Sequence, residues 1–236
     1  MYGLAARGTL ALASIALTAT LPTGAPAQTS VPLHLECVGP FGPEGSETAL
    51  RQVFGDANVA AEEIDGPEGS VLDATLLFPD DPTRRLIVLW QEEMARAKPA
   101  AIIIRDDSEW IGPGGLRLGE ALGEVEAVNG GPFNVLGFGW DYGGAASFPS
   151  GALADLPGAC VLSLSFDLDW NRDYGPEFDV IMGDQELRSD DPQLRAAGPT
   201  VAEIIIGYPF EGEPFEGEAF EGEAFGGKAS EGTDFQ

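Results

Sequence analysis

Two stretches decide the fold that the sequence predicts: Pro99-Ala100-Ala101-Ile102-Ile103-Ile104 and Pro199-Thr200-Val201-Ala202-Glu203-Ile204-Ile205-Ile206. Each begins with proline and ends in an isoleucine triplet, and β-branched residues in a short apolar run favour a strand. A short amphipathic helix pattern that ends in glycine precedes each stretch, at residues 46–55 and 121–130. The chain therefore predicts an internal repeat, which constrains a fold more strongly than any single motif.

The repeat divides a domain of residues 28–209 into two units, at about 37–107 and 110–209. Ser46 is suited to cap the first helix, and the second helix places Leu118, Leu122, Val125 and Val128 at helical spacing. Strands are expected over residues 58–64, 71–78, 86–90, 101–105, 133–142, 160–166 and 201–208. The predicted fold class is α+β: two diverged helix-plus-antiparallel-strand repeats in one domain, with the helices on one face of the sheet.

The first residues have the features of a secretory signal peptide. Arg7 supplies a positive charge, residues 10–21 are mostly apolar, and Ala25-Pro26-Ala27 is a small-residue cleavage site. The apolar run is short for a membrane span. We therefore expect residues 1–27 to be removed, Gln28 to begin the mature chain, and the protein to be periplasmic or secreted, with no membrane span.

The two cysteines, Cys37 and Cys160, fit an oxidising compartment. An even count predicts one disulfide between them, and two separate buried thiols are the alternative. No Cys-x-x-Cys occurs, so neither a dithiol redox motif nor a structural zinc site is indicated.

The charge is strongly acidic, with 12 basic against 39 acidic residues and a net charge of −27. Nucleic acids and anionic lipids bind through clusters of Lys and Arg, so they are not expected partners. A basic protein partner or cations remain compatible with this charge, which also serves solubility.

Residues 210–236 differ from the rest because Phe-Glu-Gly-Glu repeats from Phe210, Phe215 and Phe220 and then decays. Acidic, glycine-rich composition does not offset the entropy of ordering, so we expect a disordered acidic tail. Its phenylalanines could anchor on a partner, or the repeat has no role.

The segment from Gly114 to Phe133, with its apolar-x-Gly lead, short helix and following Gly-x-Pro, resembles the β-lactamase-inhibitor-like group of small exported proteins. That group includes the inhibitor, a tandem repeat, and a small outer-membrane-assembly lipoprotein. The whole domain also resembles uncharacterised exported bacterial proteins with the signature Gly-Phe-Gly-Trp-Asp-Tyr-Gly-Gly, here residues 137–144. Two departures are Gly119-Glu120 at the position of a Ser or Thr cap, and a first unit without Gly-x-Pro. The resemblance implies protein binding through a sheet face and supplies no catalytic residues.

The signature segment is also the main candidate site. On a strand, Phe138, Trp140 and Tyr142 would share one face and Asp141 the other. Together with Trp90 they would form an aromatic surface of the kind enriched at binding hot spots, and packing beneath the helices as core is the alternative.

A weaker candidate is the acidic segment with Asp167, Asp169, Asn171 and Asp173 at alternate positions. This spacing resembles the start of a calcium loop. Arg172 replaces the required glycine and Phe178 the closing glutamate, which excludes an EF-hand. A looser Ca²⁺ site and a solvated acidic loop are the two alternatives.

No catalytic constellation is evident. His34 is the sole histidine, and no phosphate-binding glycine motif follows a strand. No cofactor is implied, and a hydrolase with paired carboxylates is a distant alternative. The sequence therefore predicts a non-enzymatic protein-interaction or envelope-assembly protein whose partner is another envelope protein; a small-ligand or Ca²⁺-binding module is the runner-up.

Overall fold

The computed structural model describes residues 33–66 and 69–209, which belong to one compact unit. The predicted signal peptide, its cleavage before Gln28 and the acidic tail lie outside the described residues.

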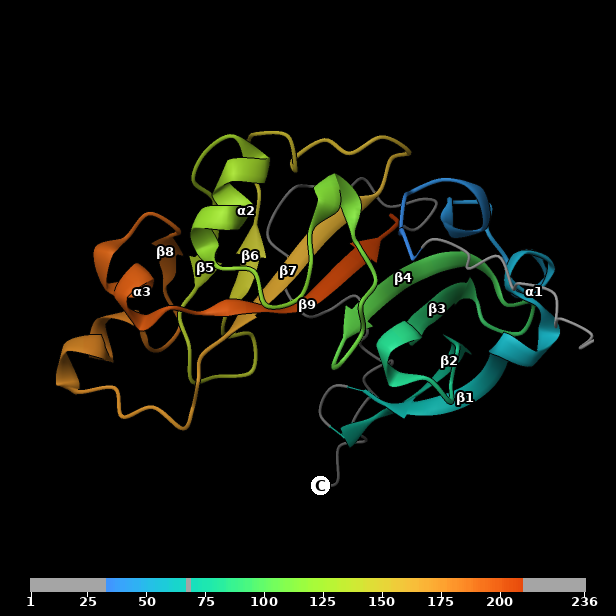
Figure 1. Cartoon of the computed structure of the whole chain (residues 1–236), viewed down its shortest axis with the longest axis horizontal. Coiled ribbons are helices and arrows are strands. Elements are labelled where there is room, and N and C mark those ends of the chain that lie inside the picture. The colour runs from blue at the N-terminus through green and yellow to red at the C-terminus, as the bar shows by residue number, and fades with distance from the viewer. Residues whose placement is uncertain (1–32, 67–68, 210–236) are drawn as a thin grey trace, which may run out of the picture. The chain divides into compact units, whose positions relative to one another are not determined.

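Nine strands form one antiparallel sheet in the order β1-β2-β3-β4-β9-β7-β6-β5-β8 (Figure 1). The first four make a meander, and β9 returns from the far end of the chain to lie between β4 and β7. The strands are β1 (Val59–Asp65), β2 (Val71–Leu77), β3 (Leu86–Glu92), β4 (Ala97–Arg105), β5 (Asn134–Leu136), β6 (Ala145–Ser147), β7 (Val161–Asp167), β8 (Glu186–Arg188) and β9 (Thr200–Gly207).

The two isoleucine triplets pair with each other at the β4–β9 junction. Ile102 lies opposite Ile206, Ile103 opposite Ile205, and Ile104 opposite Ile204. Cross-strand pairs of β-branched residues stabilise a sheet because their side chains pack on the same face. The stretches that carry the repeat signal therefore join the β1–β4 meander to the rest of the sheet.

The helices are short. They are α1 (Glu47–Phe54), α2 (Leu122–Asn129) and α3 (Pro192–Ala197), together with 3-10 helices η1 (Gly39–Phe41), η2 (Asp56–Asn58), η4 (Pro82–Arg84), η5 (Pro113–Gly115) and η6 (Pro176–Ile181). Ser46 caps α1 as predicted, because its Oγ accepts from the amide of Ala49 at 3.2 Å. Gly130 ends α2 in the left-handed region, at φ 80°. Helix α3 was not predicted.

The predicted fold class is wrong. The described chain is mainly a nine-stranded antiparallel sheet, and α1 and α2 have only 8 residues each. It is therefore not built of helix-plus-strand repeats with helices on one face. The physical reason is that glycine-rich and polar segments taken for loops also contribute strands, namely β6 and β8, whose short runs lack clear alternation.

One strand is much shorter than predicted. The sequence suggested residues 133–142, but β5 covers only Asn134–Leu136 and the signature segment after it is a loop. Glycines at 137, 139, 143 and 144 explain this, since they permit turns that a strand does not make. The ends of the other predicted strands lie within four residues of the observed ends.

A buried aromatic cluster holds α1 against the sheet. The rings of Phe41, Phe54 and Trp110 lie 5.6–5.9 Å apart by centroid, and Phe54 also meets Phe78. Edge-to-face contacts of this kind add to the free energy gained by burying the rings.

The disulfide between Cys37 and Cys160 is present, as predicted, and links residues 123 positions apart. Gly158 makes room for it, because a Cβ at that position would collide with the backbone oxygen of Cys37. The buried bridge fits an oxidising, exported compartment. Within residues 33–66 and 69–209, no helix has the length and apolar character to cross a bilayer.

Candidate functional site

Trp90 lies in the interior, only 5% exposed, and not on a binding surface. Its Nε1 donates to Thr75 Oγ1 at 2.8 Å, and this hydroxyl donates to Glu47 Oε2 at 2.8 Å. Burial raises the pKa of Glu47, but hydrogen bonds from Arg51 and Thr75 outweigh it and bring the pKa below its usual value. Trp90 therefore belongs to a polar network that joins β3, β2 and α1.

Phe138 is likewise core, at 2% exposure, whereas its neighbours reach the surface. Trp140 is half-buried, Asp141 is exposed and Tyr142 is 45% exposed. The Trp140 and Tyr142 rings meet edge to face, with centroids 5.4 Å apart. Of the five predicted residues, the structure thus brings Trp140, Asp141 and Tyr142 together at the surface, on the loop of residues 137–144, here called the aromatic loop.

Backbone hydrogen bonds hold the aromatic loop in place. The amide of Phe138 donates to Ile181 O at 2.9 Å, and the amide of Gly183 donates back to Phe138 O at 2.8 Å. Inside the loop, Trp140 Nε1 donates to Gly137 O at 2.7 Å. The loop presents Trp140 and Tyr142 at the surface from a fixed backbone, which lowers the entropy lost on binding.

The glycines of the signature have a steric role. Gly144 has φ 81°, and a Cβ there would collide with the backbone oxygen of Phe166. A Cβ at Gly137 would lie 2.5 Å from Gly183 O. The signature thus encodes close backbone packing around two surface aromatics.

The predicted acidic segment forms local turns. Asp167 Oδ1 accepts from the amide of Leu168 and from Trp170 Nε1, and Asp169 Oδ1 accepts from both the amide and Nδ2 of Asn171. Asp173 is exposed. Among the residues that the structure describes, no group of three or more His, Cys, Asp or Glu side chains could hold a metal ion. The Ca²⁺ alternative gains no support from this geometry.

His34 is exposed, and its backbone forms an isolated parallel β-bridge with Ile111.

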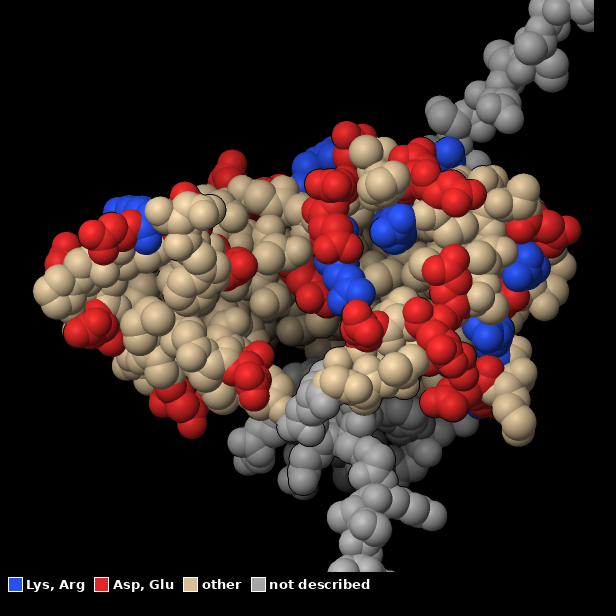
Figure 2. Space-filling model, turned by 90° about the horizontal axis from the view of Figure 1, so that it is seen from below, with Lys and Arg blue, Asp and Glu red and all other residues tan. Residues whose placement is uncertain are grey.

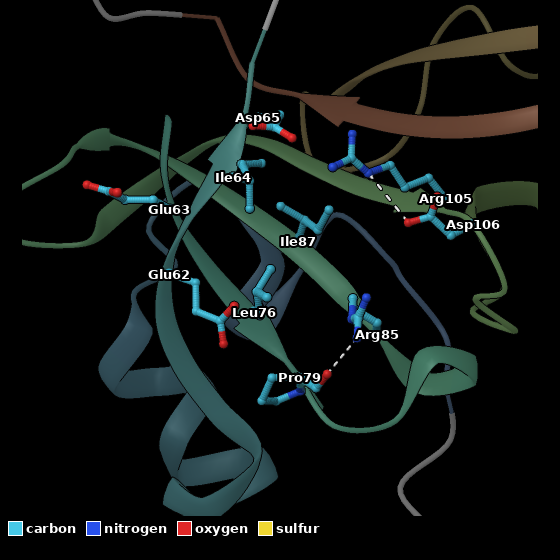
Figure 3. Close-up of a pocket in the computed structure, with 10 residues that line it drawn as sticks. All are labelled: Glu62, Glu63, Ile64, Asp65, Leu76, Pro79, Arg85, Ile87, Arg105 and Asp106. Carbon is cyan, nitrogen blue, oxygen red and sulfur yellow. Dashed lines mark hydrogen bonds and ion pairs between the residues drawn. The ribbon is translucent and has the colours of Figure 1, made fainter. Parts of the chain in front are cut away.

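A second surface, which is not among the sites predicted from the sequence, lies on the sheet face opposite Thr75. Cross-strand register places Leu76, Ile87 and Ile103 on this face, because each lies next to a residue that points toward α1. A hollow of about 330 Å³ opens here, lined by Glu62, Glu63, Ile64, Asp65, Leu76, Pro79, Arg85, Ile87, Arg105 and Asp106. In Figure 3, Leu76 and Ile87 lie between the β1 carboxylates and the two arginines.

The hollow has mixed charge. Arg105 Nε lies 3.8 Å from Asp106 Oδ2, and Arg85 donates to Pro79 O at 2.7 Å. Glu203 lies opposite Arg105 across the β4–β9 pair. Burial raises the pKa of Glu203, with Asp106 acting in the same direction and Arg105 against it. Acidic side chains predominate on the molecular face of Figure 2, with basic ones among them.

The strands themselves carry a sequence signal for this surface. Leu72, Ala74 and Leu76 alternate on β2, and Ile87 and Leu89 alternate on β3. Their alternation predicts a second apolar face only once the register of neighbouring strands is known.

Comparison of this chain with protein-family models, curated proteins and solved structures finds no match.

Proposed function

We propose that this is an exported, non-enzymatic protein of the cell envelope that binds another protein through the aromatic loop. The single observation that carries the proposal is the pair of half-buried Trp140 and exposed Tyr142, held edge to face on a hydrogen-bonded loop. Trp and Tyr are enriched among residues that dominate binding free energy, and rigid presentation favours affinity.

The charge of the chain supports a basic partner. The net charge is −27, and Asp141 stands exposed between the two aromatics. Complementary charge speeds association and selects among partners. We therefore propose a periplasmic partner that presents a Lys- or Arg-rich rim around an apolar contact, as in envelope assembly.

The test is a double substitution, Trp140→Ala with Tyr142→Ala, in an affinity capture from periplasmic extract. The captured protein is identified by mass spectrometry and then titrated in purified form against both chains. Trp170→Ala is the matched control, because Trp170 is an exposed aromatic, at 56%, outside the loop.

We expect the double variant to lose the partner while its circular dichroism is unchanged, and the control to retain it. Retention by the double variant, or an equal loss in the control, would disprove the assignment of the loop. A salt titration adds a second readout, since affinity for a basic partner should fall as salt rises.

A further inference from the structure

The sheet face opposite α1 carries a cluster of buried apolar side chains, here called the sheet-face patch. Its members are Ala74, Leu76, Ile87, Leu89, Ala101 and Ile103, all at most 8% exposed, with Ile64, Leu72, Ala100 and Ile205 packed against them. Every member belongs to β1, β2, β3, β4 or β9. No hydrophobic residue of a described helix or loop belongs to this cluster.

A sheet face excludes water from its apolar side chains by packing against a second layer. An uncovered patch of this kind on an exported protein promotes association. The low exposure of the sheet-face patch therefore requires a second layer packed against it, and among the described residues no hydrophobic side chain of a helix or loop belongs to the cluster.

The chain leaves the sheet beside this patch. Gln91 follows Trp90 on β3 and so points to the face opposite α1. Its Nε2 lies 3.3 Å from Tyr208 O and 3.4 Å from Pro209 O, and donates to these carbonyls just before residue 210. The Tyr208 side chain is fixed on the other side of the sheet, where its hydroxyl donates to Phe41 O at 2.6 Å and burial raises its pKa to about 12. Pro209, the last residue that the structure describes, is thus held on the patch side of the sheet.

Residues 210–236 have the composition to cover the patch. Phenylalanines recur at 210, 215, 220 and 225, separated by glutamates and small residues. The distance from β9 to β1 is four strand spacings, about 19 Å, and five extended residues span roughly 16 Å. Two or three repeat units are therefore long enough to cross the patch.

Charge also favours residues 210–236 as the segment that covers the patch. The segment holds eight acidic residues and one lysine. Arg85 and Arg105 line the hollow at the edge of the patch, and the buried Nε of Arg85 has no hydrogen-bond acceptor among the described residues. A glutamate between two phenylalanines would supply that acceptor.

We propose that the sheet-face patch is the docking surface for the chain's own Phe-Glu-Gly-Glu segment, with Phe210, Phe215 and Phe220 on the apolar side chains. Composition predicts disorder for this segment alone, because it cannot bury its own phenylalanines. The patch provides the apolar surface that the segment lacks. This inference goes beyond the proposed function, since it uses neither the aromatic loop nor an external partner.

Photo-crosslinking in the full mature chain tests the proposal. p-Benzoylphenylalanine replaces Phe215 or Phe220, which preserves an aromatic ring, and products are mapped by mass spectrometry after irradiation. We expect intramolecular links to residues 71–92 or 97–105. Links to another copy, to residues 28–36 or to the α1 side, or the absence of any link, would overturn the proposal.

A second measurement uses the dye ANS, which reports exposed apolar surface. The full-length variant with Phe210→Ser, Phe215→Ser and Phe220→Ser should bind more ANS with unchanged circular dichroism. Phe235→Ser, outside the repeat, should behave as the parent chain. Equal ANS fluorescence in the triple variant and the parent would also overturn the proposal.

Discussion

The indole Nε1 of Trp90 donates a hydrogen bond to Thr75 Oγ1 at 2.8 Å and so ties β3 to β2 beneath α1. The Thr75 hydroxyl in turn donates a hydrogen bond to the Glu47 carboxylate, which also forms an ion pair with Arg51 of the same helix. A residue that sequence reasoning placed on a binding surface thus organises the interior.

Trp90→Phe should destabilise the protein, because the substitution removes the donor and leaves space in the core. We expect a loss of about 1–3 kcal/mol in the free energy of unfolding, measured with urea. Trp140→Phe is the matched control: it removes a hydrogen bond within a surface loop and should cost less than about 1 kcal/mol. Equal losses would show that the Trp90–Thr75 hydrogen bond contributes no more to the free energy of unfolding than the hydrogen bond of the surface loop.

Gly144→Ala should be strongly destabilising. The new methyl group would sit at φ 81° and against the backbone oxygen of Phe166, which predicts a loss of roughly 2–4 kcal/mol. Gly131→Ala, with no atom within 4 Å of its Cβ, should be nearly neutral. The same urea titration decides this, and a neutral Gly144→Ala would contradict the described loop geometry.

Removal of the disulfide should lower stability more than either substitution. In the chain-entropy account, closing a loop across 123 positions contributes about 5 kcal/mol. The double variant Cys37→Ala with Cys160→Ala should therefore unfold at much lower urea than the parent chain. A reducing agent should lower the midpoint of the parent chain and leave that of the variant unchanged.

Glu203→Gln should stabilise the protein at neutral pH. Because burial raises the pKa of Glu203 in the folded state above its unfolded value, the protonated form stabilises the fold below the unfolded pKa. This contribution is lost as pH rises through the folded pKa. The stability difference between variant and parent should thus grow from acidic to neutral pH and then level off, as measured by thermal unfolding at several pH values.

Much of the β1–β4 meander could be predicted from local pattern. The runs at residues 71–78 and 86–90 are β-branched or alternating and are bounded by turn residues, so their strands are visible without tertiary information. Ser46 and Gly55 marked α1 for the same reason, since caps act within a few residues. β6 and β8 each cover three residues, too few for a period to emerge.

The candidate site was predicted only in part. Trp140, Asp141 and Tyr142 are at the surface, but Trp90 and Phe138 are buried. Aromatic residues are common both in protein cores and at binding interfaces, so residue type alone does not show whether a given aromatic is buried or at the surface. The non-enzymatic role, the envelope partner and the resemblance to the β-lactamase-inhibitor-like group stay predictions.

The sequence by itself predicted the ends of α1 and the strands around both isoleucine triplets, because these depend on residue type and short-range geometry. It also predicted the disulfide, because the chain has only two cysteines to pair. Only the tertiary structure decided that Ile103 lies opposite Ile205, that Trp90 faces Thr75, and that Leu76 and Ile87 share a second apolar face. The physical reason is register: which residues meet across strands far apart in the chain depends on how all nine strands pair at once.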